Sequence, residues 1–209
     1  MEIKLKEFIS GHGYLLVQQV KEWGEILINL ETKNKYKILD SNQNEVAFMA
    51  EKGGGFFSFI VRNILKNHRP MKINIWNNSQ EVLLRLERPF HWFFSDLIIK
   101  DSAGQIQGHV LRQFSILKKK YDLCDQHKRV FARIESPIWK LWKFPVFNLQ
   151  GVEIGLIEKK WGGFLKEALT DADKFQINFP DFTAEEKVVF FAAAVSVDLD
   201  FFEGNVKGS

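Results

Sequence analysis

Five stretches of the chain share one pattern: apolar and polar residues alternate, a short turn rich in Asn, Asp or Gly follows, and the alternation then resumes. Successive side chains of a β-strand point to opposite faces, so each stretch is typical of a β-hairpin. The stretches are 35–48, 72–84, 96–110, 120–132 and 143–157, with turns that begin at Asp40, Asn77, Asp101, Asp125 and Asn148. The hairpins supply ten strands, and residues 14–20 and 25–30 offer one or two more.

The spacing of these turns reveals an insertion. The later turns begin 23 or 24 residues apart, whereas the first two are 37 residues apart, so about 13 residues are added between the first and second hairpins. The added segment is 53–66, in which a Gly run precedes an apolar stretch with basic residues at its edges. Two interpretations stay open: a short amphipathic segment that lies on a membrane surface, or a helix that plugs one end of the fold. For membrane contact, the candidates here are Phe56, Phe57, Phe59, Ile60, Arg62 and Lys66.

Many evenly spaced antiparallel strands predict a closed barrel, because closure removes the free strand edges. A barrel of that size has a wide interior that must be filled. The segment 184–203 fits this role: Thr183 and Glu186 form a capping box, and 188–197 is apolar on every side, which predicts a buried helix too short to cross a bilayer. We therefore expect one mainly β domain over 1–209, an antiparallel barrel of about twelve strands that encloses a central hydrophobic C-terminal helix.

Composition narrows the possible functions. The net charge of +3 gives little support to nucleic-acid binding, and one Cys among 209 residues excludes an internal disulfide and a four-Cys zinc site. The first residues lack the apolar core of a signal peptide, so a cytoplasmic protein is expected. The His residues lack the HExxH spacing of a zinc protease. Cys124 and His127 are imaginable as a nucleophile and base, but a Cys in an alternating strand is more often packing. We therefore expect no enzyme.

The segment Lys159-Lys-Trp-Gly-Gly-Phe-Leu-Lys-Glu-Ala-Leu-Thr-Asp-Ala-Asp-Lys-Phe-Gln-Ile-Asn-Phe-Pro180 resembles the signature of the phospholipid scramblase family. Residues 31–36, 86–90 and 198–203 are also similar to that family, so the resemblance runs from about 17 to 203. It implies the Tubby C-terminal-like fold, a twelve-stranded barrel around a hydrophobic helix that is shared with LURP-one-related proteins. Animal members carry a palmitoylated Cys cluster between the first two hairpins, where this chain has the segment 53–66 without Cys.

The resemblance also implies a calcium loop at 171–182. Asp171 and Asp173 match the first and third positions of an EF-hand loop, but Phe175, Gln176 and Phe182 stand where that loop has a ligand, a glycine and a ligand. Two interpretations remain: a weak calcium site, or Asp side chains that bond to the backbone of a turn. No other cofactor is expected.

Trp139, Lys140, Trp142 and Lys143 form the best local combination for a membrane interface, because Trp favours that region and Lys attracts anionic head groups. They are equally compatible with a contact at the barrel rim. Given the resemblance, the leading hypothesis is a membrane-associated phospholipid-binding module without covalent chemistry, whose partner is an anionic phospholipid surface on the inner face of the plasma membrane. The alternatives are calcium-dependent translocation of phospholipids between leaflets, and a soluble regulatory module that binds protein or nucleic acid; no protein partner is identified.

Overall fold

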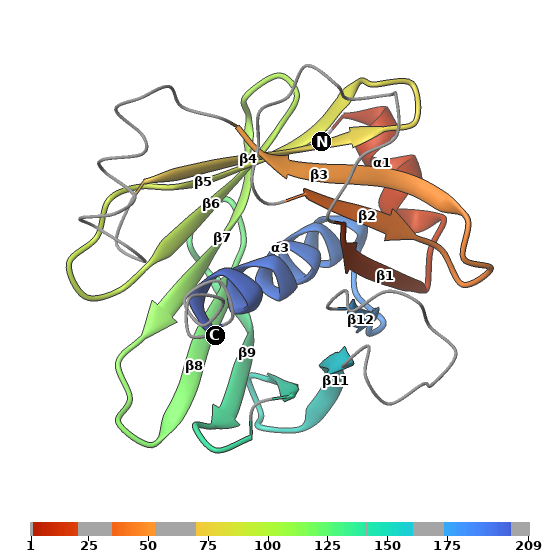
Figure 1. The fold of residues 1–209 in the computed structure, drawn as a ribbon. Helices are drawn as coiled ribbons and strands as arrows, with labels where there is room; N and C mark the ends of the chain where they lie inside the picture. Colours follow the sequence, from red (N-terminus) through yellow and green to blue (C-terminus); the bar gives the residue numbers. More distant parts are fainter. Residues whose placement is uncertain (1, 21–34, 53–69, 141, 161–173, 202–209) are drawn as a thin grey trace, which may run out of the picture.

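The computed structural model describes residues 2–20, 35–52, 70–140, 142–160 and 174–201. These residues form twelve antiparallel strands in one closed barrel, in which each strand pairs with its neighbours in sequence and β12 closes against β1 (Figure 1). The strands are β1 (Tyr14–Gln19), β2 (Lys35–Leu39), β3 (Glu45–Glu51), β4 (Met71–Asn77), β5 (Val82–Arg88), β6 (Asp96–Asp101), β7 (Ile106–Gln113), β8 (Lys118–Cys124), β9 (Val130–Pro137), β10 (Lys143–Asn148), β11 (Glu153–Lys160) and β12 (Lys174–Asn178). The expected barrel is confirmed, whereas the possible strand at 25–30 and the segment 53–66 lie outside the described residues.

The five expected hairpins are all present, and their turns have the same construction. In each turn the first residue is Asp or Asn, and its Oδ1 accepts a hydrogen bond from the backbone N–H four residues later; at Asp40 the donor is Asn44, at 2.8 Å. The fourth residue of every turn has a positive φ, and the strand register shifts just before the turn, which is the type I turn with a G1-like bulge. The residues with positive φ are Gln43, Gln80, Gly104, Lys128 and Gly151.

This connectivity gives the barrel two different ends. Because neighbouring strands run antiparallel, the five tight turns lie together at one end, which we call the hairpin end. The links β5–β6 (89–95), β7–β8 (114–117) and β9–β10 (138–142) lie at the opposite end, which we call the linker end. These three links are neighbours around the barrel because strand order follows sequence order.

A helix that the sequence pattern did not predict covers the hairpin end. Helix α1 (Ile3–Ser10) packs against the central helix and β5, and its Leu5 and Ile9 are fully buried. Leu5 and Ile9 stand four residues apart and so share one helix face. Lys4 forms an ion pair with Glu81 in the β4–β5 turn, which ties the outer face of α1 to the barrel.

Helix α3 (Ala184–Phe201) runs through the barrel, as Figure 1 shows, and confirms the expected central helix. Its capping box is formed as expected: the Thr183 N–H donates to Glu186 Oε2 at 2.9 Å, and the Glu186 N–H donates to Thr183 Oγ1 at 3.2 Å. Every residue from Val188 to Val197 is buried. The helix begins at the hairpin end and ends at the linker end, where it places Asp198 and Asp200.

Cys124 also belongs to the packed part of the fold. It pairs with His109 across β7 and β8, and it is fully buried. Burial, together with the nearby negative charges of Asp122 and Asp125, raises the pKa of the Cys124 thiol to about 11. Burial lowers the pKa of His109, so both side chains favour their neutral forms.

Replacing Gly108 with Ala tests how closely α3 packs against the barrel. The added Cβ would lie 2.4 Å from Val189 Cγ2 and 2.6 Å from the Cys124 carbonyl oxygen, and the carbonyl belongs to backbone that cannot rotate away. We expect Gly108→Ala to lower the free energy of unfolding by about 1–3 kcal/mol in urea denaturation. Gly13→Ala is the control, because nothing lies within 4 Å of its added Cβ, and its change should stay within about 0.5 kcal/mol. Equal stability of the two variants would contradict the tight helix–strand contact.

The Cys124 thiol provides a second test, by reaction with Ellman's reagent. Only the thiolate reacts, and the folded-state pKa lies above the unfolded value, so folding keeps the thiol protonated between about pH 9 and pH 11. We expect negligible labelling of the native protein at pH 8 and at pH 9.5, and complete labelling within minutes in denaturant at both values. Fast labelling of the native protein would show that Cys124 is accessible and ionised.

Candidate functional site

Large apolar side chains are exposed mainly at the linker end. Of the thirteen that are exposed among the described residues, nine belong to its three links: Phe90, Trp92, Phe93, Phe94, Phe114, Ile116, Leu117, Ile138 and Trp139. We call these nine residues the apolar rim. Single exposed apolar residues are ordinary, but such a concentration at one end of a molecule marks an interaction surface.

Contacts between the links make the apolar rim one surface rather than three separate loop tips. Phe94 of the β5–β6 link meets Phe114 of the β7–β8 link edge-on, with 6.0 Å between ring centroids. The Ile138 N–H of the β9–β10 link donates a hydrogen bond of 3.1 Å to the Leu117 carbonyl. Phe93 at 81% and Trp92 at 74% in the first of these links, and Ile116 at 75% in the second, are the most exposed members.

The two ends of the barrel also differ in charge. Basic residues outnumber acidic ones on the outer surface near the linker end: Lys35, Lys52, Lys72, Lys118, Lys120, Lys140, Lys143 and Lys174 against Glu87, Asp96, Glu135 and Glu158. Acidic residues outnumber basic ones near the hairpin end: Glu2, Glu7, Asp40, Glu45, Glu81, Asp125, Glu153, Asp181, Glu185 and Glu186 against Lys4, Lys6, Lys37, Lys128, Arg129 and Lys187, while Lys100 pairs with Glu87. The apolar rim therefore belongs to the more basic end.

Two carboxylates lie near the end of α3, and one of them, Asp200, lies beneath the β5–β6 and β7–β8 links. Asp200 accepts hydrogen bonds from Tyr121 Oη at 2.8 Å, Ser95 Oγ at 3.1 Å and Arg88 Nη1 at 3.1 Å. Its neighbour Asp198 accepts one from Tyr36 Oη at 2.7 Å. The C-terminal end of a helix carries partial negative charge, so carboxylates there need compensating donors and cations. Burial, with the Asp200 charge, raises the pKa of Tyr121 well above its usual value, so Tyr121 stays a hydrogen-bond donor.

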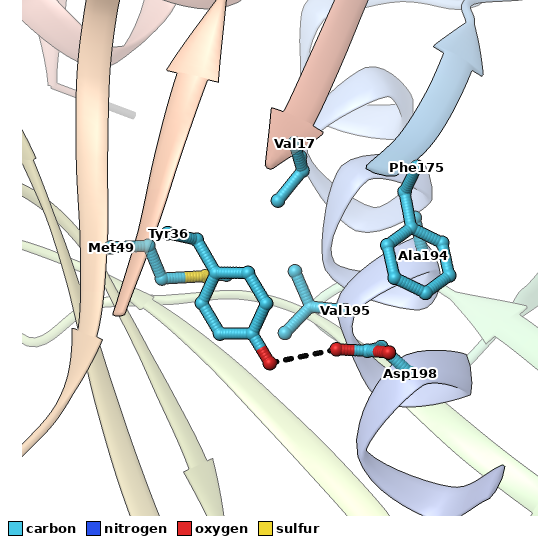
Figure 2. Close-up of a pocket in the computed structure, with 7 residues that line it drawn as sticks. All are labelled: Val17, Tyr36, Met49, Phe175, Ala194, Val195 and Asp198. Carbon is cyan, nitrogen blue, oxygen red and sulfur yellow. Dashed lines mark hydrogen bonds between the residues drawn. The ribbon is translucent and has the colours of Figure 1, made fainter. Parts of the chain in front are cut away.

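The interior beside α3 is nearly filled. Figure 2 shows a small cavity between α3 and strands β1, β2, β3 and β12, with the Tyr36 hydroxyl turned toward Asp198. Its volume is about 10 Å³, the space of about one water molecule. A phospholipid acyl chain or head group does not fit there, and the surface at the linker end remains the candidate site.

The structure places part of the membrane-contact set expected from the sequence at the linker end. Trp139 is 68% exposed within the apolar rim, and Lys140 and Lys143 are exposed close to it. Trp142, the fourth residue of the combination of Trp and Lys residues at 139–143, is half-buried and so less exposed than the other three. The candidates Phe56, Phe57, Phe59, Ile60, Arg62 and Lys66 lie outside the described residues.

The sequence pattern did not predict the seven rim residues of the β5–β6 and β7–β8 links: Phe90, Trp92, Phe93, Phe94, Phe114, Ile116 and Leu117. The available signal was Phe90-His-Trp-Phe-Phe94, in which aromatic residues cluster between two strands without strand alternation. A stretch of that kind cannot put every ring on the inner face of a barrel.

The calcium candidates Asp171 and Asp173 lie outside the described residues, so that site stays a prediction. The same twelve-residue stretch continues into β12, where Phe175 is buried in the core, and Phe182 packs edge-on against Phe190 of α3. Among the described residues, no group of three or more His, Cys, Asp or Glu side chains is placed to hold a metal ion.

Two further structural findings bear on the expected functions. Cys124 is buried with a raised pKa, whereas His127 is exposed in the β8–β9 turn, so the structure does not bring them together as nucleophile and base. Within the described parts of the chain, no helix combines the length and apolar character needed to cross a membrane.

Comparison with known proteins identifies the same family that the segment 159–180 resembles. A family model described as Scramblase matches residues 2–204. Phospholipid scramblase 2 of Homo sapiens is 29% identical over 211 residues, which cover 94% of this chain and 70% of that protein. Phospholipid scramblase 1 of Mus musculus is 30% identical over 94% of this chain and 63% of its own length. Altered inheritance rate of mitochondria protein 25 of Saccharomyces cerevisiae is 23% identical, covering 93% of this chain and 72% of that protein.

Among solved structures, a protein from Arabidopsis thaliana aligns over 90% of both chains with a TM-score of 0.46 and 15% identity. The family assignment therefore rests on the family model, which covers nearly the whole sequence and includes the barrel, the three links of the linker end and the central helix. The chain belongs to the phospholipid scramblase family.

Proposed function

We propose that this protein is a membrane-associated phospholipid-binding module that docks on anionic bilayers through its apolar rim and performs no covalent chemistry. The observation that carries the proposal is the concentration of exposed Trp, Phe, Ile and Leu side chains at one end of the barrel. The names of relatives, phospholipid scramblases of mammals, support a phospholipid as the partner.

The composition of the apolar rim suits the boundary between lipid and water. Trp and Phe carry large apolar rings, and Trp adds an N–H that bonds to the polar head-group region. Burying one such side chain gains about 1.5–3 kcal/mol, so insertion of a few rim residues is enough for reversible binding. Their place in three neighbouring links lets them enter the bilayer together, without unfolding any strand.

The charge difference between the ends favours one orientation. Lysines near the apolar rim, such as Lys140 and Lys143, would face anionic head groups, each contributing about 1 kcal/mol near an acidic surface. The more acidic hairpin end, with α1, would point away from the membrane. This orientation favours the cytoplasmic face of the plasma membrane, whose lipids are rich in negative charge.

A second candidate function is movement of phospholipids between leaflets, which the names of the relatives favour. A rim that enters one leaflet gives docking, while translocation also requires a path for the head group across the bilayer. Dithionite reduction of fluorescent lipids in protein-containing vesicles, with and without calcium, separates the two functions. Lipid flipping above the protein-free rate would establish translocation.

Exchanging two rim residues for Asp tests the docking surface. We expect Trp92→Asp/Phe93→Asp to lower the partition coefficient onto vesicles of phosphatidylcholine and phosphatidylserine by at least tenfold, because two large apolar groups are lost and two negative charges are added. Co-sedimentation at several lipid concentrations measures this change. The fold should persist, since both side chains are exposed.

Leu149→Asp/Val152→Asp is the matched control, because these residues are also exposed and apolar but lie at the hairpin end, at 52% and 58% exposure. This control should bind vesicles as the wild type does. Equal loss in both double variants, or no binding by the wild type, would overturn docking through the apolar rim.

A further inference from the structure

One carboxylate connects the central helix to the bases of two rim links. Asp200 lies near the end of α3, and its side chain is 2% exposed. Its hydrogen-bond and ion-pair partners lie at the bases of the β5–β6 and β7–β8 links, at the ends of the strands or directly beside them. It therefore lies directly beneath the part of the apolar rim that holds Trp92, Phe93, Phe94 and Phe114.

The β5–β6 link is fixed at both of its ends by this carboxylate. Arg88, the last residue of β5, donates a hydrogen bond through Nη1 to Oδ1 of Asp200 at 3.1 Å. Ser95, directly before β6, donates through Oγ to both oxygens, at 3.1 and 3.3 Å. The six residues between Arg88 and Ser95 thus form a loop whose two ends meet at Asp200.

The β7–β8 link is tied to the same group. Tyr121 of β8 donates a hydrogen bond to Asp200 at 2.8 Å, and Nη1 of Arg112 in β7 lies 3.7 Å from the carboxylate. The Arg112 backbone N–H also donates to the Ser95 carbonyl at 3.1 Å, which joins the bases of the two links directly. Above this junction Phe94 and Phe114 are in contact.

Asp198, two residues before Asp200 on the same helix, is a second carboxylate with which Asp200 can be compared. Its carboxylate bonds to Tyr36 of β2 and lies 3.8 Å from Lys159 of β11. Those strands lie away from the β5–β6 and β7–β8 links around the barrel. The two carboxylates are therefore alike in chemistry and lie near the same end of the helix, but only Asp200 contacts the bases of the β5–β6 and β7–β8 links.

We propose that Asp200 is a positioning residue, which holds the β5–β6 and β7–β8 links in the arrangement that binds a phospholipid membrane. This inference rests on the proposed function. Exposed aromatic side chains on a loose loop lose conformational entropy when they dock, whereas links already fixed at their bases lose less. Removing the charge of Asp200 leaves Arg88 buried beside a neutral group, which favours movement of the link that Arg88 begins.

The test compares Asp200→Asn with Asp198→Asn by two measurements, hydrogen exchange and vesicle binding. For Asp200→Asn we expect at least tenfold faster amide exchange in 89–95 and 113–118, together with at least a fivefold lower partition coefficient on anionic vesicles. For Asp198→Asn, exchange in those segments and vesicle binding should stay within twofold of the wild type. Both variants change one buried carboxylate to an amide, so a general loss of stability would affect them alike.

Ser95→Ala is the milder variant if Asp200→Asn does not fold, because it leaves both charges in place and removes only the hydroxyl hydrogen bonds at one end of the β5–β6 link. Faster exchange in 89–95 with weaker vesicle binding would support the positioning role. Unchanged exchange and binding in a folded Asp200→Asn or Ser95→Ala variant, while the wild type binds vesicles, would overturn the role of Asp200 alone. A wild type that does not bind vesicles would overturn the proposed function and this inference with it.

Discussion

Burial of helix α3 is the interaction on which the rest of the structure depends. A barrel of twelve strands cannot fill its interior with strand side chains alone, and ten consecutive residues of α3 occupy that space. Each Val or Phe buried there gains about 1.5–3 kcal/mol relative to exposure. Because the interior is occupied by the protein's own helix, the outer surface and the two ends of the barrel are what remain for contact with other molecules.

The two ends are built under different constraints. Each turn of the hairpin end repeats one hydrogen-bonded arrangement that needs Asp or Asn first and a positive φ three residues later, so its residue types are largely determined by geometry. The links of the linker end carry no such requirement. Their residues can therefore be aromatic and exposed. The turns are held by hydrogen bonds within each turn, whereas the β5–β6 and β7–β8 links are held at their bases by hydrogen bonds to the Asp200 carboxylate.

The strands, the hairpins and the buried helix follow from local patterns that the sequence displays: alternation, Asx turns and the capping box of Thr183 and Glu186. Helix α1 could not be predicted from such a pattern. Its buried face consists of Leu5 and Ile9 alone, and two apolar residues are too few to indicate a helix until the barrel end that they cover is known. Among the rim residues, Trp139 was identified from its neighbouring lysines, while Trp92 and Phe93 were not. Whether an aromatic residue between two strands is buried depends on the barrel's curvature and on which link lies beside it, and neither is encoded locally.

Closure of the barrel has a kinetic consequence. Strand β1 pairs with β12, and the helix that fills the interior follows β12 in the chain. During synthesis the earlier hairpins therefore leave the ribosome before the element that covers their inner faces exists. Contacts between distant parts of a chain form slowly, and exposed apolar strand faces invite aggregation. The five self-contained turns can hold the hairpins in register during this interval, but the apolar faces are protected from water only after α3 has emerged.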